Sequence, residues 1–244
     1  MRHETVTTPS FQDAPGYLPD DHRVYAIGDI HGCAERLWAL HAAIAADLAA
    51  RPVSAPLLVH VGDYVDRGPD SAGVVQRLAA GDPLPGVPTV NLMGNHERTM
   101  IDALDGAGAS ATDWMISGGR EALASWGGDP DAPRATWRAH VPDADLAFLR
   151  GLALRHQVGG YLFVHAGIRP GVKLSVQADQ DLLTIRNSFL YSEQDFGVVV
   201  VHGHTPRMAP EIRFNRIGID TGAVFGGKLT CAVLEARRIG FIQA

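Results

Sequence analysis

Three short, mostly apolar runs in this chain each end in a polar loop flanked by glycine, and this recurrence constrains the fold most strongly. The runs cover residues 24–27, 57–61 and 89–93, and the loops that follow them read GDIHG, GDYVDRG and GNHE. Short runs rich in β-branched residues and bounded by Gly, Asp or Asn are typical of strands. The chain therefore predicts three strands, each of which ends in a tight polar loop.

Helical patterns separate these predicted strands. Leucine or isoleucine at positions 37, 40, 44 and 48 recurs at intervals of three or four residues, which is one face of a helix. A second helix is predicted over residues 70–80, with Asp70 or Ser71 as its N-cap. Strands that alternate with helices in this way favour a mostly parallel sheet covered by helices, and so an α/β fold.

The second half of the chain has a different texture. Residues 97–151 are expected to be helical and rich in loops. Strand-like segments then return in close succession: YLFVHAG, VVVVHGHTP, IGIDTG, LTCAVLE and RIGFIQ. Because little helical sequence separates the last of them, we expect this half to be more antiparallel. Residues 1–22 contain Pro9, Pro15 and Pro19 and are expected to form an extended N-terminal arm, with residues 23–244 as one domain.

The composition excludes several classes of protein. The chain has 244 residues, of which 46% are hydrophobic and 20% charged, which is typical of a globular protein and not of a disordered one. No apolar run approaches the ~18 residues of a membrane helix, and no secretory signal is apparent, so we expect no membrane partner. Cys33 and Cys231 are too few for a disulfide framework, which favours the cytoplasm. The net charge of −6 argues against a nucleic-acid partner.

Polar side chains with metal-ligand chemistry follow five of the apolar runs. They are Asp29, His31, Asp63, Asn95, His96, His165 and His204. In open α/β sheets, ligands bind outside the carboxyl ends of the strands. Oxygen and nitrogen donors without thiolate suit Mn²⁺, Fe and Zn²⁺. Each motif alone is common, and a single histidine after a strand usually belongs to the core. Six or more donors together predict two ions about 3.5–4 Å apart that share a carboxylate.

The loops also resemble those of a known family. GDIHG (28–32), GDYVDRG (62–68), GNHE (94–97), HAG (165–167) and GHT (203–205) resemble the phosphoprotein phosphatase family of calcineurin-like metallophosphoesterases. The bacteriophage-lambda type and the small bacterial Ser/Thr protein phosphatases are most similar. The resemblance runs from about residue 24 to the C-terminus. It implies a single catalytic domain in which helices flank a central mixed β-sandwich, with the active site at the C-terminal ends of the strands.

The resemblance implies a role for each matching residue. Asp29 and His31 would hold one divalent metal ion, Asp63 would bridge both ions, and the second ion would be completed by Asn95, His165 and His204. His96 would act as general acid, oriented by Asp66. Arg67 and Arg186 would bind the phosphate together with Asn95 and His96. The match at Arg186 is the loosest, because related segments usually carry Trp two residues earlier, where this chain has Thr184.

These residue types together suit phosphate-ester hydrolysis. Two cations neutralise the phosphoryl oxygens and lower the pKa of a shared water, arginine matches the geometry of phosphate, and a histidine acid is typically worth 10²–10⁴ in rate. We therefore predict direct attack by a hydroxide bound to both metals, without a phosphoenzyme. The expected substrates are phosphoserine, phosphothreonine and, as a further candidate, phosphotyrosine in a phosphoprotein or phosphopeptide. Mn²⁺ is the expected metal in vitro, with Fe and Zn²⁺ as alternatives.

Two other functions compete with this prediction. The symmetric diadenosine tetraphosphate hydrolases of the same superfamily usually carry Gln for His in GDxHG and lack the second Asp of the DRG motif. This chain keeps both residues, as His31 and Asp66, which favours the phosphatase. The remaining alternative is a non-catalytic module that binds phosphorylated ligands. The sequence does not identify a regulatory partner.

Several residues near these motifs permit more than one interpretation. Glu97 could hydrogen-bond a ligand histidine or lie on the surface at a helix start, and Tyr64 could line the phosphate pocket or pack in the core. His60 is expected in the core, and tryptophans 114, 126 and 137 are expected to pack the helical insert. Five histidines outside the motifs are expected on the surface: His3, His22, His41, His140 and His156.

Overall fold

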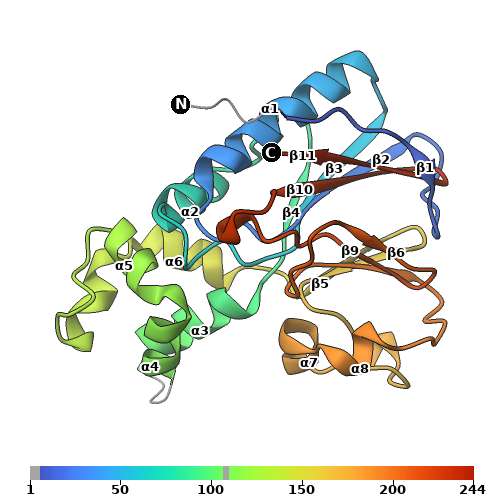
Figure 1. The fold of residues 1–244 in the computed structure, drawn as a ribbon. Helices are drawn as coiled ribbons and strands as arrows, with labels where there is room; N and C mark the ends of the chain where they lie inside the picture. Colours follow the sequence, from blue (N-terminus) through green and yellow to red (C-terminus); the bar gives the residue numbers. More distant parts are fainter. Residues whose placement is uncertain (1–5, 107–109) are drawn as a thin grey trace.

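Two stacked β-sheets form the centre of the computed structural model, which describes residues 6–106 and 110–244 (Figure 1). Within these residues the first sheet has the order β1 (Gln12–Asp13), β11 (Arg238–Gln243), β10 (Thr230–Glu235), β2 (His22–Ile27), β3 (Ala55–His60) and β4 (Thr89–Asn91). The second sheet has the order β5 (Arg155–Val158), β6 (Tyr161–Val164), β7 (Val199–His202), β9 (Arg216–Gly218) and β8 (Glu211–Ile212). The predicted α/β fold with a central mixed β-sandwich is confirmed.

The strand directions differ in part from the expectation. Strands β2, β3 and β4 are parallel, as predicted, and β10 is antiparallel to both β2 and β11. In the second sheet β5 and β8 are antiparallel to their neighbours, but β6, β7 and β9 run parallel. The short helices α7 (Asp179–Thr184) and α8 (Asn187–Leu190) lie in the crossover between β6 and β7. This crossover permits the parallel pairing, and the continuous apolar run of β7 is typical of it.

The two predicted helices are present beside the first sheet. Helix α1 (Ala34–Ala50) packs its apolar face against the strands, and α2 (Ser71–Ala79) follows Asp70, whose carboxylate accepts a hydrogen bond from the Gly73 N–H at 2.8 Å. This contact satisfies one of the unpaired amides at the helix start.

The predicted helical insert forms one end of the molecule. It contains α3 (Asn95–Leu104), α4 (Ser110–Trp114), a π-helical turn (Met115–Gly119), α5 (Arg120–Ser125), a 3₁₀ segment (Arg134–His140) and α6 (Asp143–Arg150). Trp114 and Trp137 are buried there with ring centroids 5.9 Å apart, and the Trp126 indole donates to Asp145. The tryptophans therefore pack this insert as expected.

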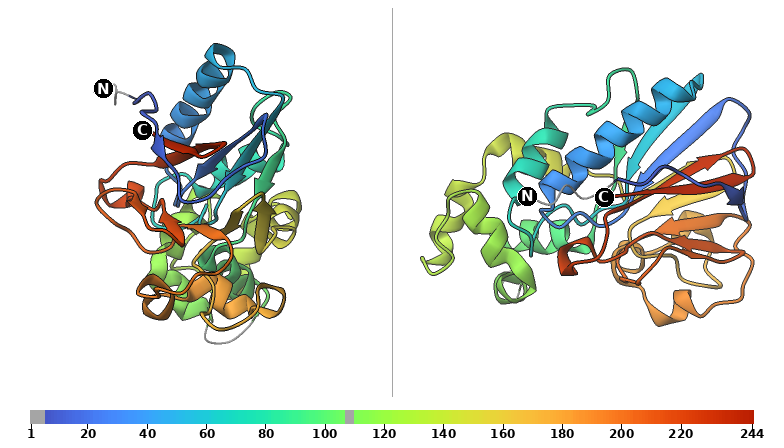
Figure 2. Two further views of the ribbon diagram at one scale, coloured as in Figure 1. Left: turned by 90° about the vertical axis from the view of Figure 1, so that its right-hand side faces the viewer. Right: turned by 45° about the horizontal axis from the view of Figure 1, so that its top comes forward.

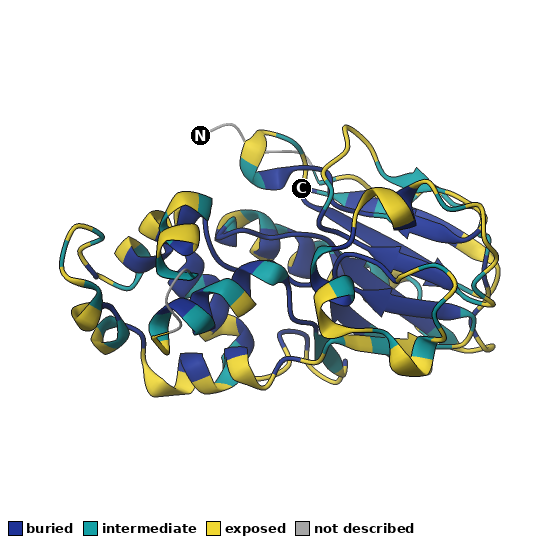
Figure 3. Cartoon of the chain, turned by 90° about the horizontal axis from the view of Figure 1, so that it is seen from below, coloured by how far each residue is buried: buried dark blue, intermediate teal, exposed yellow. Residues whose placement is uncertain are grey.

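Successive side chains of a strand point to opposite faces of its sheet, so each sheet packs against the other sheet on one face and against helices on the other. The result is four layers, in the order helices, sheet, sheet, helices (Figure 2). Val24 and Ala26 of β2 point between the sheets, whereas Tyr25 points toward α1. In β6, Phe163 points between the sheets and Leu162 points toward α7 and α8. Both faces of each sheet are thus covered, and the central strands are buried (Figure 3). Polar side chains can therefore come together in the loops at the strand ends, which the buried sheet faces do not allow.

The described part of the N-terminal segment lies along the first sheet. Strand β1 pairs with β11, and the guanidinium carbons of Arg51 and Arg238 each lie 4.6 Å from the centroid of the Phe11 ring. Residues 1–5, including His3, lie outside the described residues. None of the described helices is long and apolar enough to cross a membrane.

One histidine expected at the surface lies in the core. His41 is 5% exposed, and its Nε2 is 3.1 Å from Nε2 of His60, which is buried as expected. His41 follows Leu40 on the buried face of α1, so the helical pattern could have placed it inside. His22, His140 and His156 are partly exposed.

Candidate metal centre and phosphate pocket

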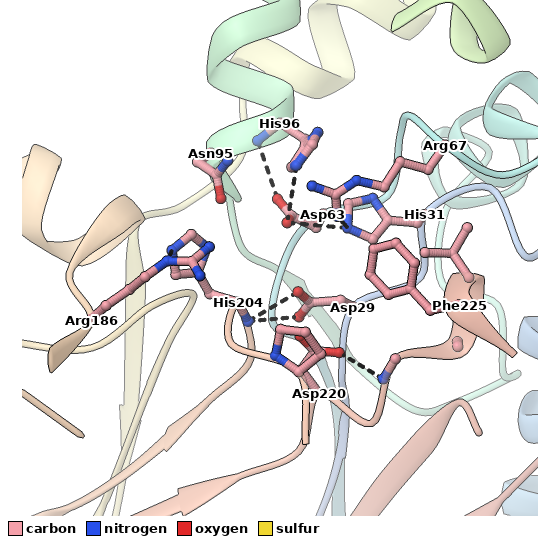
Figure 4. A pocket seen from close by; sticks show the side chains of 14 residues that line it. Asp29, His31, Asp63, Arg67, Asn95, His96, Arg186, His204, Asp220 and Phe225 are labelled. Carbon is pink, nitrogen blue, oxygen red and sulfur yellow. Dashed lines mark hydrogen bonds and ion pairs between the residues drawn. The ribbon is translucent and has the colours of Figure 1, made fainter. Parts of the chain in front are cut away.

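The predicted site residues converge at one end of the two sheets. Loops after β2, β3, β4, β6 and β7 bring Asp29, His31, Asp63, Asn95, His165 and His204 together. All of them except His165 line a cavity of about 250 Å³, which Figure 4 shows from close by. His165 does not line the cavity but contacts a residue that does, with its Nε2 3.4 Å from the Asp63 carboxylate. Side chains up to 175 residues apart in the chain thus share one small volume.

Asp63 occupies the middle of this arrangement. Among the described residues, two groups have ligand atoms close enough to hold a metal ion: His31 with Asp63 and His96, and Asp63 with His165 and His204. The Asp63 Oδ2 atom is 3.5 Å from Nε2 of His31, and its Oδ1 atom is 3.4 Å from Nε2 of His165. One carboxylate therefore presents its two oxygens to two neighbouring positions, which is the arrangement expected of a bridging ligand.

The histidines have the chemical form that a divalent cation requires. The Nδ1 atoms of His31 and His165 lie 2.8 and 3.0 Å from the carbonyl oxygens of Val65 and Val61. A carbonyl acceptor fixes the proton on Nδ1 and leaves the Nε2 lone pair facing Asp63. Burial lowers the pKa of His31 to about 3 and also lowers the pKa of His165. These neutral imidazoles, with buried carboxylates beside them, fit two divalent ions.

The backbone at the site is held in conformations that most residues avoid. The described chain contains seven non-glycine residues with positive φ, and five of them are His31, Asp63, Asp66, Arg67 and His204. Such conformations cost of order 1–3 kcal/mol each, so the surrounding structure must maintain them. At Gly94, a Cβ atom would lie 2.1 Å from the Asp63 carboxylate. The glycine in the GNHE loop is therefore required for the close approach of Asp63.

His96 and Asp66 form a buried pair beside Asp63. Nδ1 of His96 is 2.6 Å from Asp66 Oδ2, while the other Asp66 oxygen accepts from the Trp114 indole at 2.8 Å. Burial alone would lower the pKa of His96, but the Asp63 and Asp66 carboxylates outweigh it and raise the pKa. His96 Nε2 faces the pocket, 3.9 Å from Asp63. The pair thus favours the protonated form of an imidazole at the cavity.

Arg67 and Arg186 approach the cavity from opposite sides (Figure 4). An Arg67 guanidinium nitrogen lies 2.6 Å from Nε2 of His31, and Arg186 Nε donates to Nε2 of His204 at 3.1 Å. The Arg67 backbone is fixed by a 3.1 Å hydrogen bond to Gly118, whereas Arg186 is exposed just before α8. Both arginines predicted to bind phosphate therefore line the same cavity.

Comparison with known proteins decides the family. Residues 22–239 match the family model of the calcineurin-like phosphoesterases. The chain belongs to this family. It is also 30% identical over 227 residues to Serine/threonine-protein phosphatase 1 of Salmonella typhimurium, covering 87% of this chain and 92% of that protein.

Other metallophosphoesterases are similar over different extents. A symmetrical bis(5'-nucleosyl)-tetraphosphatase of Aromatoleum aromaticum is 34% identical over 149 residues, which cover 61% of this chain and only 45% of that protein. A solved structure described as a putative diadenosine tetraphosphatase has a TM-score of 0.65 at 24% identity, covering 91% of this chain and 93% of the other. This last likeness concerns the fold alone.

Glu97 has a role in this metallophosphoesterase that neither sequence interpretation described. It is fully buried, so the surface interpretation is wrong. Its carboxylate accepts hydrogen bonds of 2.7–3.1 Å from the backbone N–H groups of Asp63, Tyr64, Val65 and Gly94. Glu97 thereby joins the GDYVDRG and GNHE loops. Tyr64 is also buried, and its hydroxyl donates to the Leu92 carbonyl at 2.7 Å, so it packs in the core.

Asp220 is a pocket residue that the sequence analysis did not identify. It follows β9 and lies in the cavity beside Asp29. Burial raises the pKa of Asp220 to about 6, and burial together with Asp220 and Asp63 raises the pKa of Asp29. The segment IGIDTG has the same strand-then-polar-loop pattern as the recognised motifs, and this pattern could have identified it. The concentration of carboxyl groups further favours a cation in the cavity.

Proposed function

We propose that this metallophosphoesterase is a phosphomonoesterase that hydrolyses phosphoserine and phosphothreonine in proteins, with phosphotyrosine as a further candidate substrate. The observation that carries the proposal is the His96–Asp66 pair, at 2.6 Å, beside a cavity that two arginines line. The oxygen of serine leaves as an alkoxide of high pKa and needs a proton donor, which a raised-pKa histidine supplies. Similarity to a bacterial serine/threonine phosphatase over 92% of that protein supports the same substrate class.

The residues divide the reaction between them. Arg67 and Arg186 bind the phosphoryl oxygens from two sides, and their planar donor groups orient the ester. His96 donates its Nε2 proton to the leaving oxygen, while Asp66 holds Nδ1 and favours the charged imidazole. Asp29, His31, Asp63, Asn95, His165 and His204 would hold two divalent cations, which supply charge neutralisation and a nucleophile from water near neutral pH. We propose Mn²⁺ for activity in vitro, with Fe and Zn²⁺ compatible with the same donors.

We propose that water attacks the phosphorus directly. The proposed mechanism needs no nucleophile from the protein, because the aspartates and histidines to which it gives a role bind metal, donate a proton or orient the proton donor. The described residues that line the cavity also include no Ser, Thr or Cys. Turnover of a substrate with a chiral phosphate should therefore invert the configuration at phosphorus. Net retention would show two successive displacements and would contradict direct attack.

Hydrolysis of dinucleoside polyphosphates is the second candidate. The 34% identity to a symmetrical tetraphosphatase favours it, whereas the retention of His31 and Asp66 favours the phosphatase. Purified protein in Mn²⁺ should be given a phosphoserine peptide and diadenosine tetraphosphate in parallel. We expect the larger kcat/KM on the peptide; no activity on any phosphomonoester would contradict the proposal.

A non-catalytic binding module is the third candidate. Replacing His96 with Asn would leave every function of such a module intact, whereas we expect hydrolysis to fall.

We further propose a reducing, cytoplasmic location from the low cysteine count, and a phosphoprotein rather than a nucleic acid as partner from the net charge of −6.

A further inference from the structure

One wall of the phosphate cavity consists of carbon. Next to the charged residues, the lining is completed by Pro206, Ala223, Val224 and Phe225. Neither metal binding nor phosphate binding requires such a wall, because both use polar groups. These apolar residues are therefore available to contact the organic group of the substrate to which the phosphate is esterified.

The turn that bears this wall is held in place. Residues Ala223–Phe225 form a 3₁₀ turn between Gly222 and Gly226, which have φ of 68° and 87°. The Phe225 N–H donates to the Gly222 carbonyl at 2.9 Å. Arg36 of α1 donates to the carbonyl groups of Ala223, at 3.0 Å, and Gly227. These contacts fix the turn before any substrate arrives.

Phe225 presents its ring to the cavity. Phe225 is 66% exposed, although burying a phenylalanine is normally favourable. The guanidinium carbon of Arg67 is 5.4 Å from the ring centroid, and Figure 4 shows the ring beside Arg67 and His31. The cation holds the ring next to the position where we propose that phosphate binds.

We propose that Phe225 is a specificity-determining residue that contacts the aromatic ring of an aryl phosphate, such as the side chain of phosphotyrosine. The inference rests on the proposed function, because it assumes that phosphate binds at Arg67. The Phe225 ring lies beside Arg67, so a phenyl ring joined through one oxygen to a phosphate bound there would lie next to it. Aromatic rings attract each other at centroid distances of about 4.5–7 Å. The single methylene of phosphoserine is too small to make the same contact.

The test compares two peptides that differ only in phosphotyrosine or phosphoserine. Phe225→Ala, Phe225→Trp and the parent protein are assayed on both, and the ratio of the two kcat/KM values is compared between proteins. Comparing this ratio between the variants and the parent cancels the different intrinsic reactivities of the two esters. Phe214→Ala is the matched control, since Phe214 is also exposed, at 53%, and does not line the cavity.

We expect Phe225→Ala to lower the phosphotyrosine-to-phosphoserine ratio about tenfold, Phe225→Trp to restore most of it, and Phe214→Ala to leave it unchanged. An unchanged ratio, or an equal loss on both peptides, would overturn the inference while leaving the proposed function intact. A parent protein that hydrolyses neither peptide would instead contradict the proposed function.

Discussion

The inner cluster of the site, Asp29, His31, Asp63, His165 and His204, differs in construction from its rim, Arg186, Pro206, Val224 and Phe225. Every member of the inner cluster is buried, at 0–8% exposure, and several depend on positive φ or on a neighbouring glycine. The rim residues are exposed or half-buried and stand on short turns. We therefore propose that the chemistry depends on a fixed buried backbone, whereas the choice of substrate depends on exposed side chains.

The largest effect is expected at the centre of the inner cluster. Asp63→Asn removes the charge shared by both potential metal groups, so kcat/KM should fall by more than about 10³-fold, and metal affinity should fall as well. Steady-state kinetics with metal titration would measure both. Asp113→Asn, an exposed change in the helical insert, serves as control. Retained activity in a folded Asp63→Asn protein would contradict the claim that the chemistry depends on the inner cluster.

His96→Asn separates catalysis from metal binding. We expect kcat to fall by about 10²–10⁴-fold, because the proton donor is lost. Metal content should stay at the parent value, since we assign no metal to His96. If elemental analysis found that half the metal was lost, His96 would be a ligand, as its place in one of the two geometric groups allows.

Glu97→Gln tests whether metal binding requires the hydrogen bonds that fix the backbone of the inner cluster. The amide NH₂ of glutamine would face backbone N–H donors that now point at a carboxylate oxygen. We expect metal affinity to fall about 10- to 100-fold. Competition with a chelator would measure it, with the exposed Glu121→Gln as control. Equal metal affinities for the Glu97→Gln and Glu121→Gln proteins would show that the GDYVDRG and GNHE loops keep their conformation without the Glu97 carboxylate.

Arg186→Ala is a rim substitution and should have a smaller effect. Loss of one charge-assisted contact to phosphate should lower kcat/KM about tenfold, mostly through KM, and leave metal content unchanged. Arg120→Ala, an exposed arginine of the helical insert, should change neither quantity. A large loss of metal in Arg186→Ala would place this residue functionally within the inner cluster.

The smallest expected effect is a shift in the pH profile. Asp63 and Asp66 raise the pKa of His96 against the effect of burial, so the acid form persists to higher pH and kcat falls as pH rises through that pKa. Asp66→Asn removes one of these carboxylates. The alkaline limb of the kcat profile should therefore move to lower pH. An unmoved limb would mean that another group controls it.

The sequence was most informative where structure is determined locally. Strand texture followed by a glycine-flanked polar loop is a short-range pattern, and it led to Asp29, Asp63 and His204, which now share one cavity. The helices over residues 34–50 and 71–79 likewise follow from apolar spacing and a capping Asp70.

Long-range contacts explain what was missed. Glu97 bonds backbone amides 32–34 residues away, and no local pattern reveals such partners. The wall at Phe225 depends on Arg36, which is 187 and 191 residues from the carbonyl groups it binds. The parallel pairing of β6 with β7 depends on a crossover whose helices have only a few residues, too short to leave a periodic signal.

The metal content of the purified protein tests the central claim most directly. Elemental analysis after loading with Mn²⁺, Fe or Zn²⁺ should find two ions per chain, and fewer in Asp63→Asn. A folded chain that binds no metal under any of these conditions would contradict the account, because the buried imidazoles and carboxylates would then have no cation to hold.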